Sequence, residues 1–369
     1  MSDLAPTRPR PGLPLGLLGM LALVAAVELT IQGRRLDFTT VWADDWRRTA
    51  EATAREARGR DVLCFGDSLV KYGVLPRVIE AKTGLRSYNL AINAGTMPSA
   101  YFLLRRTLES GVRPRAIVAD FFALMLPDAP RVSVRMYPEL AGARDCLDLA
   151  RTSADPSFLA ATLTGKLLPS YKCRFEIRNS LVGAFRGVRT SPWPAQAAVW
   201  ASWKAEAGAQ PMPQPPARFP ADPAILAQLN PGAWECDPIN AEYFDRFLAL
   251  ARSENLPVFW LMPPLGPELQ ALRSSSGADA AYTRFAKLAM VRHPGLTILD
   301  ARAAGYDATV HIDAIHLDRR GAEILTADLA NHLADRLAGR SEARWVDLPP
   351  FAGRASQSAG SPGIESTRR

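Results

Sequence analysis

One serine lies where an open α/β sheet would place a nucleophile. Ser68 belongs to the tetrapeptide Gly66-Asp67-Ser68-Leu69, which directly follows the apolar run 61–65. A short apolar run that ends at a glycine is typical of a buried parallel strand. Because ligands bind beyond the carboxyl ends of such strands, Ser68 is a candidate nucleophile. A serine hydroxyl is a poor nucleophile near neutral pH, so this chemistry requires an adjacent base.

The candidate bases are few, because the chain has only four histidines, at positions 293, 311, 316 and 332. His293 precedes a proline after an expected helix, and His332 lies within another helix. His311 and His316 remain, both in the loop after the last expected strand. Asp313 stands three residues before His316, so its carboxylate can bind one ring nitrogen while the other faces Ser68. We predict Ser68 as nucleophile, His316 as base and Asp313 as the residue that orients it.

Each motif has a simpler interpretation. A Gly-Asp-Ser after a strand is often only a turn, and an Asp-x-x-His before a helix can be a capping turn. The Gly-x-Ser-x-Gly pattern of the nucleophile elbow is absent, because Val70 stands where its second glycine would be. The hypothesis therefore depends on both motifs meeting at one edge of the same sheet.

The expected elements place them there. Apolar runs alternate with amphipathic segments, which predicts a three-layer α/β fold with a five-stranded parallel sheet. The expected strands are 61–65, 87–92, 116–121, 258–262 and 296–299. The expected helices are 74–82, 99–110, 241–255, 279–292 and 320–337.

The regular alternation is interrupted between about residues 127 and 238, a Pro- and Trp-rich stretch that we interpret as a partly helical insertion. We expect an N-terminal tail at 1–12, a hydrophobic segment at 13–32, a stalk or linker helix at 33–59 and the main domain at 60–338. The Ser-, Gly- and Pro-rich residues 339–369 are expected to be a disordered tail.

The hydrophobic segment allows two interpretations. Leu13 to Val27 is uncharged and follows Arg8 and Arg10, and Glu28 interrupts it. It predicts either a cleaved secretory signal peptide or an uncleaved signal anchor, a transmembrane helix that ties the protein to a membrane. In either case we expect the catalytic domain outside the cytoplasm, membrane-anchored or secreted.

Composition argues against several classes of protein. The net charge is +7, but the arginines are scattered and often stand beside acids, so we expect no nucleic-acid partner. The four cysteines form no CxxC or Cys/His cluster, so a zinc site is not expected. Nothing implies another metal or an organic cofactor.

Taken together, the two motifs resemble the GDSL/SGNH hydrolase family. Its first block corresponds to Gly66-Asp67-Ser68-Leu69, and its last block to Asp313-Ala314-Ile315-His316. The resemblance covers about residues 60–338 apart from the insertion. It implies a flavodoxin-like sheet with strand order 2-1-3-4-5, in which Ser68 attacks a carbonyl, His316 takes its proton and Asp313 orients His316.

The inner blocks of the family match less well. Its second block supplies an oxyanion-hole glycine, for which Gly95 is the nearest match, or Ala94 if the alignment shifts by one. Asn93 could add a side-chain amide or could be a turn residue. The third block, Gly-x-Asn-Asp, is replaced by residues 119–122, which include no Asn. One oxyanion donor is therefore missing or replaced, a loss that costs roughly 10²–10³ in rate in known cases.

Three functions follow. The first is an esterase that acts on a small-molecule or glycan acyl ester. The second is an O-acyltransferase that acetylates an extracellular polysaccharide, because family members anchored in membranes include such enzymes. The third is an inactive module that binds glycan through an aromatic surface in the insertion, although packing of the insertion explains those aromatics better. They are Trp193, Trp200, Trp203 and Trp234.

Overall fold

The computed structural model describes residues 15–33, 40–130, 134–188, 193–215, 222–230 and 232–353. The chain divides into two compact units. The first unit comprises residues 1–39 and 164–190, and the second comprises residues 40–163 and 191–369. Both predicted motifs belong to the second unit, and the expected N-terminal tail at 1–12 lies outside the described residues.

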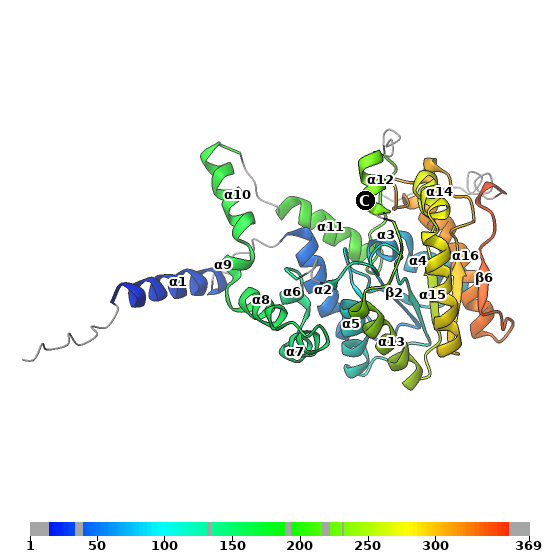
Figure 1. Cartoon of the computed structure of the whole chain (residues 1–369), viewed down its shortest axis with the longest axis horizontal. Coiled ribbons are helices and arrows are strands. Elements are labelled where there is room, and N and C mark those ends of the chain that lie inside the picture. Colours follow the sequence, from blue (N-terminus) through cyan, green and yellow to red (C-terminus); the bar gives the residue numbers. More distant parts are fainter. Residues whose placement is uncertain are drawn as a thin grey trace, which may run out of the picture. The chain divides into compact units, whose positions relative to one another are not determined.

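The second unit is built on a parallel sheet, flanked by helices (Figure 1). The strand order is β2-β1-β3-β4-β5-β6. Its strands are β1 (Val62–Phe65), β2 (Ser87–Asn89), β3 (Ala116–Ala119), β4 (Val258–Met262), β5 (Leu296–Asp300) and β6 (Trp345–Asp347). The α/β class and the parallel sheet were predicted correctly, and the first five strands follow the order of a flavodoxin-like sheet.

The predicted number of strands was wrong, because the sheet has six rather than five. β6 lies in the segment expected to be a disordered tail and pairs with β5, Trp345 opposite Ile298. The Arg344 side chain donates to the carbonyls of Leu296 and His293 at 3.3 and 2.9 Å, which ties the chain beside β5 just before the strand begins. A three-residue edge strand with half-exposed side chains has no apolar run that would indicate it.

Helices cover both faces of the sheet. On one side α5 (Met97–Glu109), α13 (Pro238–Ser253) and α15 (Ala278–Arg292) share a core with inward residues such as Leu63 and Ile117. On the other side α4 (Pro76–Thr83) and α16 (Arg319–Leu337) pack with the alternate residues, such as Val62 and Val118. Successive side chains of a strand point to opposite faces, so strands buried on both sides are apolar throughout.

The region between β3 and α13 is largely helical. It contains α6 (Tyr137–Leu140), α7 (Ala143–Thr152), α8 (Pro156–Leu167), α9 (Pro169–Lys172), α10 (Arg174–Phe185), α11 (Trp193–Ala205) and α12 (Pro223–Leu229). α9 and α10 belong to the first unit, whereas α11 and α12 belong to the second. The segments that follow α11 and α12 contribute to the cavities described below.

In the first unit, α1 (Leu15–Gly33) contacts α9. Glu28 of α1 is buried and accepts hydrogen bonds from the backbone N–H of Ser170, at 3.1 Å, and from the Ser170 hydroxyl. No helix in the described part of the chain is long and apolar enough to cross a membrane. The prediction of a transmembrane signal anchor was therefore wrong, and the carboxylate within the apolar run is one physical reason.

The segment expected as a stalk or linker helix contributes to the second unit. α2 (Val41–Arg55) contacts α5 and α6, and more than half of its residues are buried. Trp46 is fully buried, packs edge to face on Tyr137 at 5.3 Å and donates its indole N–H to the carbonyl of Asn93 at 2.8 Å. This helix therefore touches the loop after β2, close to the predicted site.

The packing of α2 predicts different effects for two tryptophans of that helix. Trp46 is 0% exposed and Trp42 is 55% exposed. We expect Trp46→Ala to lower the free energy of unfolding by about 3–5 kcal/mol, because it leaves a cavity and an unpaired carbonyl. The matched control Trp42→Ala should change it by about 0.5 kcal/mol or less. Urea unfolding followed by circular dichroism measures both, and equal values would contradict a core role for α2.

Candidate active site

Ser68 begins the short helix α3 (Ser68–Gly73), directly after β1. Asp67 caps this helix, and its side chain accepts from the Leu69 N–H at 2.8 Å. Gly66 has φ of +141°, and a Cβ there would lie 1.7 Å from an oxygen of Asp120. Only glycine fits this close approach, which turns the chain sharply enough to present Ser68 at the carboxyl edge of the sheet.

The three residues predicted to act together are hydrogen-bonded to one another. The Ser68 Oγ lies 2.8 Å from Nε2 of His316, and Nδ1 of His316 lies 2.7 Å from Oδ2 of Asp313. With Nδ1–H donated to the carboxylate, Nε2 is unprotonated and accepts from the serine hydroxyl. This arrangement can remove a proton from Ser68 while the acid holds the imidazole in place.

The loop that carries the acid and the base is held by its own backbone. Asp313 Oδ1 accepts from the N–H groups of Ile315 and His316, both at 2.8 Å. Burial works to raise the pKa of Asp313, but these bonds and the imidazole outweigh it and lower the pKa below its ordinary value. The Ile312 N–H donates to the His316 carbonyl at 2.9 Å, which closes the turn. Asp313 therefore stays ionised at neutral pH.

The other histidines lie elsewhere. His311 is buried, donates its Nδ1–H to the carbonyl of Asp307 at 2.9 Å, and has its pKa lowered by burial. His293 pairs with Asp245 at 3.1 Å. His332 is on α16. Of the four histidines, His316 alone hydrogen-bonds Ser68 among the described residues.

Of the residues predicted for the oxyanion hole, only some have a free N–H group that could donate to an oxyanion beside Ser68. The Gly95 N–H donates to the carbonyl of Ile92 at 3.1 Å, and Gly95 packs so closely on Gly66 that a Cβ would lie 2.8 Å from its carbonyl oxygen. Asn93 lines the cavity beside Ser68, and its Nδ2 donates to Asp45 at 2.7 Å, which leaves its second amide hydrogen. Within the described chain the Ser68 N–H has no acceptor.

Ser68 and His316 open into a cavity of about 410 Å³. Its walls come from the segment after β3, from the insertion and from the loop that carries His316. The apolar lining residues include Phe122, Leu124, Met125, Leu229, Trp234 and Ile315. Phe122 lies in the segment where the resemblance leads one to look for an Asn, so this part of the wall is apolar rather than a hydrogen-bond donor. A largely apolar cavity with a few polar groups is typical of a small-molecule site.

Two buried carboxyls lie behind the serine. The Asp67 N–H donates to Asp120 Oδ1 at 3.1 Å, and the two side chains also interact with each other. Burial, followed by the negative charge of Asp67, raises the pKa of Asp120 well above its ordinary value, and burial also raises the pKa of Asp67. Two carboxylates this close cannot both be ionised cheaply, so the pair retains a proton to higher pH than exposed acids do.

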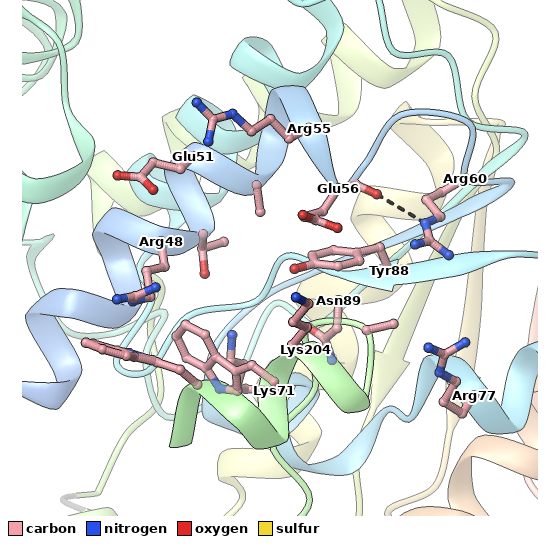
Figure 2. Close-up of a pocket in the computed structure, with 16 residues that line it drawn as sticks. Arg48, Glu51, Arg55, Glu56, Arg60, Lys71, Arg77, Tyr88, Asn89 and Lys204 are labelled. Atoms are coloured by element: carbon pink, nitrogen blue, oxygen red, sulfur yellow. Dashed lines mark hydrogen bonds between the residues drawn. The ribbon is translucent and has the colours of Figure 1, made fainter. Parts of the chain in front are cut away.

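Lys71 and Tyr72, which are neighbours on α3 just after Ser68, point to different places. Tyr72 lines the Ser68 cavity, donates its hydroxyl to Asn93 Oδ1, and has its ring 5.0 Å from that of His316. Lys71 instead faces a separate cavity of about 290 Å³ (Figure 2). There its ammonium lies 3.1 Å from Asp45 and 3.8 Å from the ring centre of Trp203, and burial lowers its pKa.

Asp45 is the site residue that sequence reasoning missed. It is fully buried on α2, where it binds Lys71, Thr49 and both the N–H and the side-chain amide of Asn93. Through these bonds α2 holds α3 and the loop after β2 together behind Ser68. The signal in the sequence was that Asp45 lies on the same face of the helix as Trp46 and Thr49. Charged residues are normally exposed, so this position would be assigned to the face of α2 that contacts solvent. Among the described residues no cluster of metal-ligating side chains occurs.

Comparison with known proteins does not identify a family. No protein-family model matches the chain, and no curated protein is significantly similar to it. The resemblance to the GDSL/SGNH hydrolases therefore depends on the two short motifs and on the site in which they meet.

The Asp67–Asp120 pair predicts that stability falls as pH rises. Their raised pKa values mean that the folded protein holds a proton that the unfolded chain releases above about pH 4. The free energy of unfolding should then fall by about 1.4 kcal/mol per pH unit, from about pH 4 up to the raised pKa. Asp120→Asn keeps the shape of the side chain and removes this titration. The free energy of unfolding of the variant, measured relative to that of the wild type, should therefore rise with pH. Urea unfolding between pH 4 and 8 measures this, with Glu342→Gln at an exposed position as the control. A constant difference between Asp120→Asn and wild type would contradict the shared proton.

Proposed function

We propose that the second unit is a serine hydrolase of acyl esters, in which Ser68 is the nucleophile, His316 the general base and Asp313 its orienting acid. The observation that carries this proposal is the unbroken chain of hydrogen bonds from Ser68 Oγ through His316 to Asp313, with distances of 2.8 and 2.7 Å. A serine in a plain turn has no need of an imidazole whose tautomer is fixed by a carboxylate.

The reaction follows from this geometry. His316 Nε2 takes the hydroxyl proton as Ser68 attacks the ester carbonyl, and it then returns that proton to the leaving alcohol. Water, activated by the same nitrogen, hydrolyses the acyl-serine. The developing oxyanion would be met by the Ser68 N–H and by the second amide hydrogen of Asn93, which Asp45 and Tyr72 hold in orientation.

Transfer to an alcohol other than water is the second candidate, and the shape of the cavity is the observation that favours it. Residues 228–230 and 232–234 of the insertion form part of the wall of the site, so the space beside Ser68 is partly closed and mainly apolar. Such a wall can disfavour water as acceptor. Supplying the purified protein with a chromogenic acetate ester, with and without an acetyl-accepting polysaccharide, and following the acetyl group would separate the two reactions.

An inactive glycan-binding module is less well supported. Trp203 is buried against the ammonium of Lys71, and Arg48 stacks on Trp200 at 3.3 Å. Trp234 donates its indole N–H to the carbonyl of Ala123 at 2.6 Å and packs on Tyr282 at 5.3 Å. The tryptophans are thus used in packing within the unit, and the Trp193 side chain lies outside the described residues. Export of the protein remains a prediction from its N-terminal sequence.

The triad predicts a graded series of variants. We expect Ser68→Ala and His316→Ala to lower kcat for 4-nitrophenyl acetate by about 10⁴-fold or more, because each removes a partner of the same proton transfer. Asp313→Asn should retain some activity, with a loss of up to about 10⁴-fold. The control His311→Ala removes a histidine that does not touch Ser68 and should leave kcat within about threefold, although it can lower stability.

Labelling with a fluorophosphonate tests the nucleophile directly. Wild type should be labelled at Ser68, and Ser68→Ala should not be labelled at all. If wild type stays unlabelled under conditions that label an active esterase, or if His311→Ala is the inactive variant, the assignment of Ser68 and His316 is wrong.

A further inference from the structure

Arg273 is a buried arginine in the wall of the Ser68 cavity. It lies on α14 (Pro267–Ser275), a helix not expected from the sequence, and it is only 2% exposed. Among the described residues that line the cavity it is the only Lys or Arg. A buried charge needs a partner, because transfer out of water is costly.

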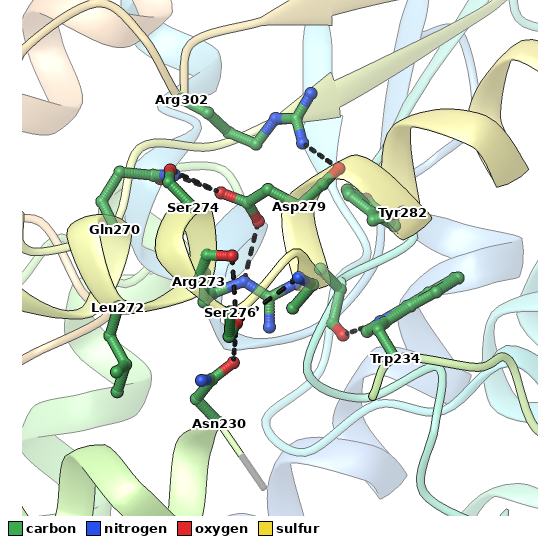
Figure 3. Close-up of polar contacts among 12 residues, drawn as sticks. Asn230, Trp234, Gln270, Leu272, Arg273, Ser274, Ser276, Asp279, Tyr282 and Arg302 are labelled. Atoms are coloured by element: carbon green, nitrogen blue, oxygen red, sulfur yellow. Dashed lines mark hydrogen bonds and ion pairs between the residues drawn. The ribbon is translucent and has the colours of Figure 1, made fainter. Parts of the chain in front are cut away.

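Its charge is only partly satisfied by the protein. The Nε–H donates to Asp279 Oδ1 at 2.9 Å, and the same carboxylate also accepts from Gln270 and Ser274 (Figure 3). Nη2 of Arg273 is buried and has no hydrogen-bond partner among the described residues. By contrast, the neighbouring Arg302 binds both oxygens of Asp300, at 2.9 and 2.6 Å. A guanidinium nitrogen left without an acceptor costs free energy in the free protein, and this cost is recovered when a ligand supplies an acceptor.

Surrounding contacts fix the end of the helix that carries Arg273. Ser276 donates to the Arg273 carbonyl at 3.1 Å and lies 3.4 Å from Asn230 Oδ1, which links α14 to the insertion (Figure 3). Leu269, one helical turn earlier on α14, belongs to the same hydrophobic cluster as Leu69, which follows Ser68. An apolar surface thus connects the nucleophile to the helix that carries the unpaired guanidinium nitrogen.

We propose that Arg273 binds a carboxylate of the substrate, so that the ester cleaved at Ser68 carries an apolar spacer and a free carboxylate on its acyl side. This proposal rests on the proposed function and names its substrate class. The planar guanidinium suits a carboxylate, and Nη2 offers two hydrogens for which the described part of the chain provides no acceptor.

The first test compares matched esters. The probes are 4-nitrophenyl monoesters of glutaric, adipic and pimelic acids and their neutral methyl diesters, with Ser68→Ala as the blank. For at least one length the wild type should prefer the anionic ester by about tenfold or more in kcat/KM. Arg273→Met should lose this preference, and Arg273→Lys, which keeps the charge, should retain part of it. The control Arg284→Gln removes an equal charge from an exposed site on α15 and should keep the full preference.

A second test measures binding without turnover, so that failure of catalysis and failure of this proposal are distinguishable. Monomethyl glutarate, adipate and pimelate are titrated into Ser68→Ala by calorimetry, with the dimethyl diesters for comparison. If Ser68→Ala binds a monomethyl ester more tightly than the corresponding dimethyl diester, and the double variant Ser68→Ala/Arg273→Met does not, the carboxylate site is supported even if no ester is cleaved. Cleavage of neutral esters by Ser68 with no anionic preference, or a preference that persists in Arg273→Met, overturns it. If Arg273→Met does not fold, the wild-type preference and Arg273→Lys decide, and equal kcat/KM for anionic and neutral esters in wild type overturns the proposal.

Discussion

The hydrogen bond between Ser68 and His316 joins residues 248 positions apart, and it can form only if the strands between them keep their register. Ser68 follows β1 and His316 follows β5, and β3 and β4 lie between these strands in the sheet. A slip of one residue in any of the three pairings would move one partner by about 3.3 Å, beyond hydrogen-bonding distance. The register is fixed because every residue of β1, β3, β4 and β5 is buried, and a slip would exchange the side chains between the two cores.

Behind this edge the site depends on buried polar groups rather than on apolar packing. Asp45 neutralises Lys71 and orients Asn93, while Asp120 receives the N–H of Asp67 beside the nucleophile. Buried charges of this kind give little net stability, because the loss of hydration offsets the attraction between partners. They do allow few alternative arrangements, since every other arrangement leaves a charge without a partner. The free energy lost when these polar groups are dehydrated is thus the counterpart of the fixed positions of Ser68 and Asn93.

The parts that could be predicted from the sequence are those with a local signal. The first five strands are apolar runs that end near turn residues, and the Asp-x-x-His spacing brings Asp313 to His316 within a single tight turn. What could not be predicted depends on contacts between distant segments. Asp45 and Arg273 have the residue types of exposed helix positions, and only the packing of α2 and α14 shows that both are buried. The three residues of β6 are too few to distinguish a strand from a loop by their pattern. The apolar N-terminal run predicted a membrane-spanning helix, which the described residues do not contain.

In the proposed hydrolase the chemistry and its selectivity have separate origins in the chain. The groups proposed for proton transfer follow β1 and β5, which the sheet places rigidly. Part of the cavity wall comes instead from α14 and from residues 228–230 and 232–234, which belong to connections between the elements of the sheet. In that enzyme, contacts that these walls make equally with substrate and transition state would change KM, whereas a change in the triad would lower kcat. These walls pack on the cluster of Leu69, Phe122, Leu265 and Leu269 and, through Trp234, on Tyr282 of α15, so the contacts named here are with segments that flank the strands whose register places Ser68 and His316.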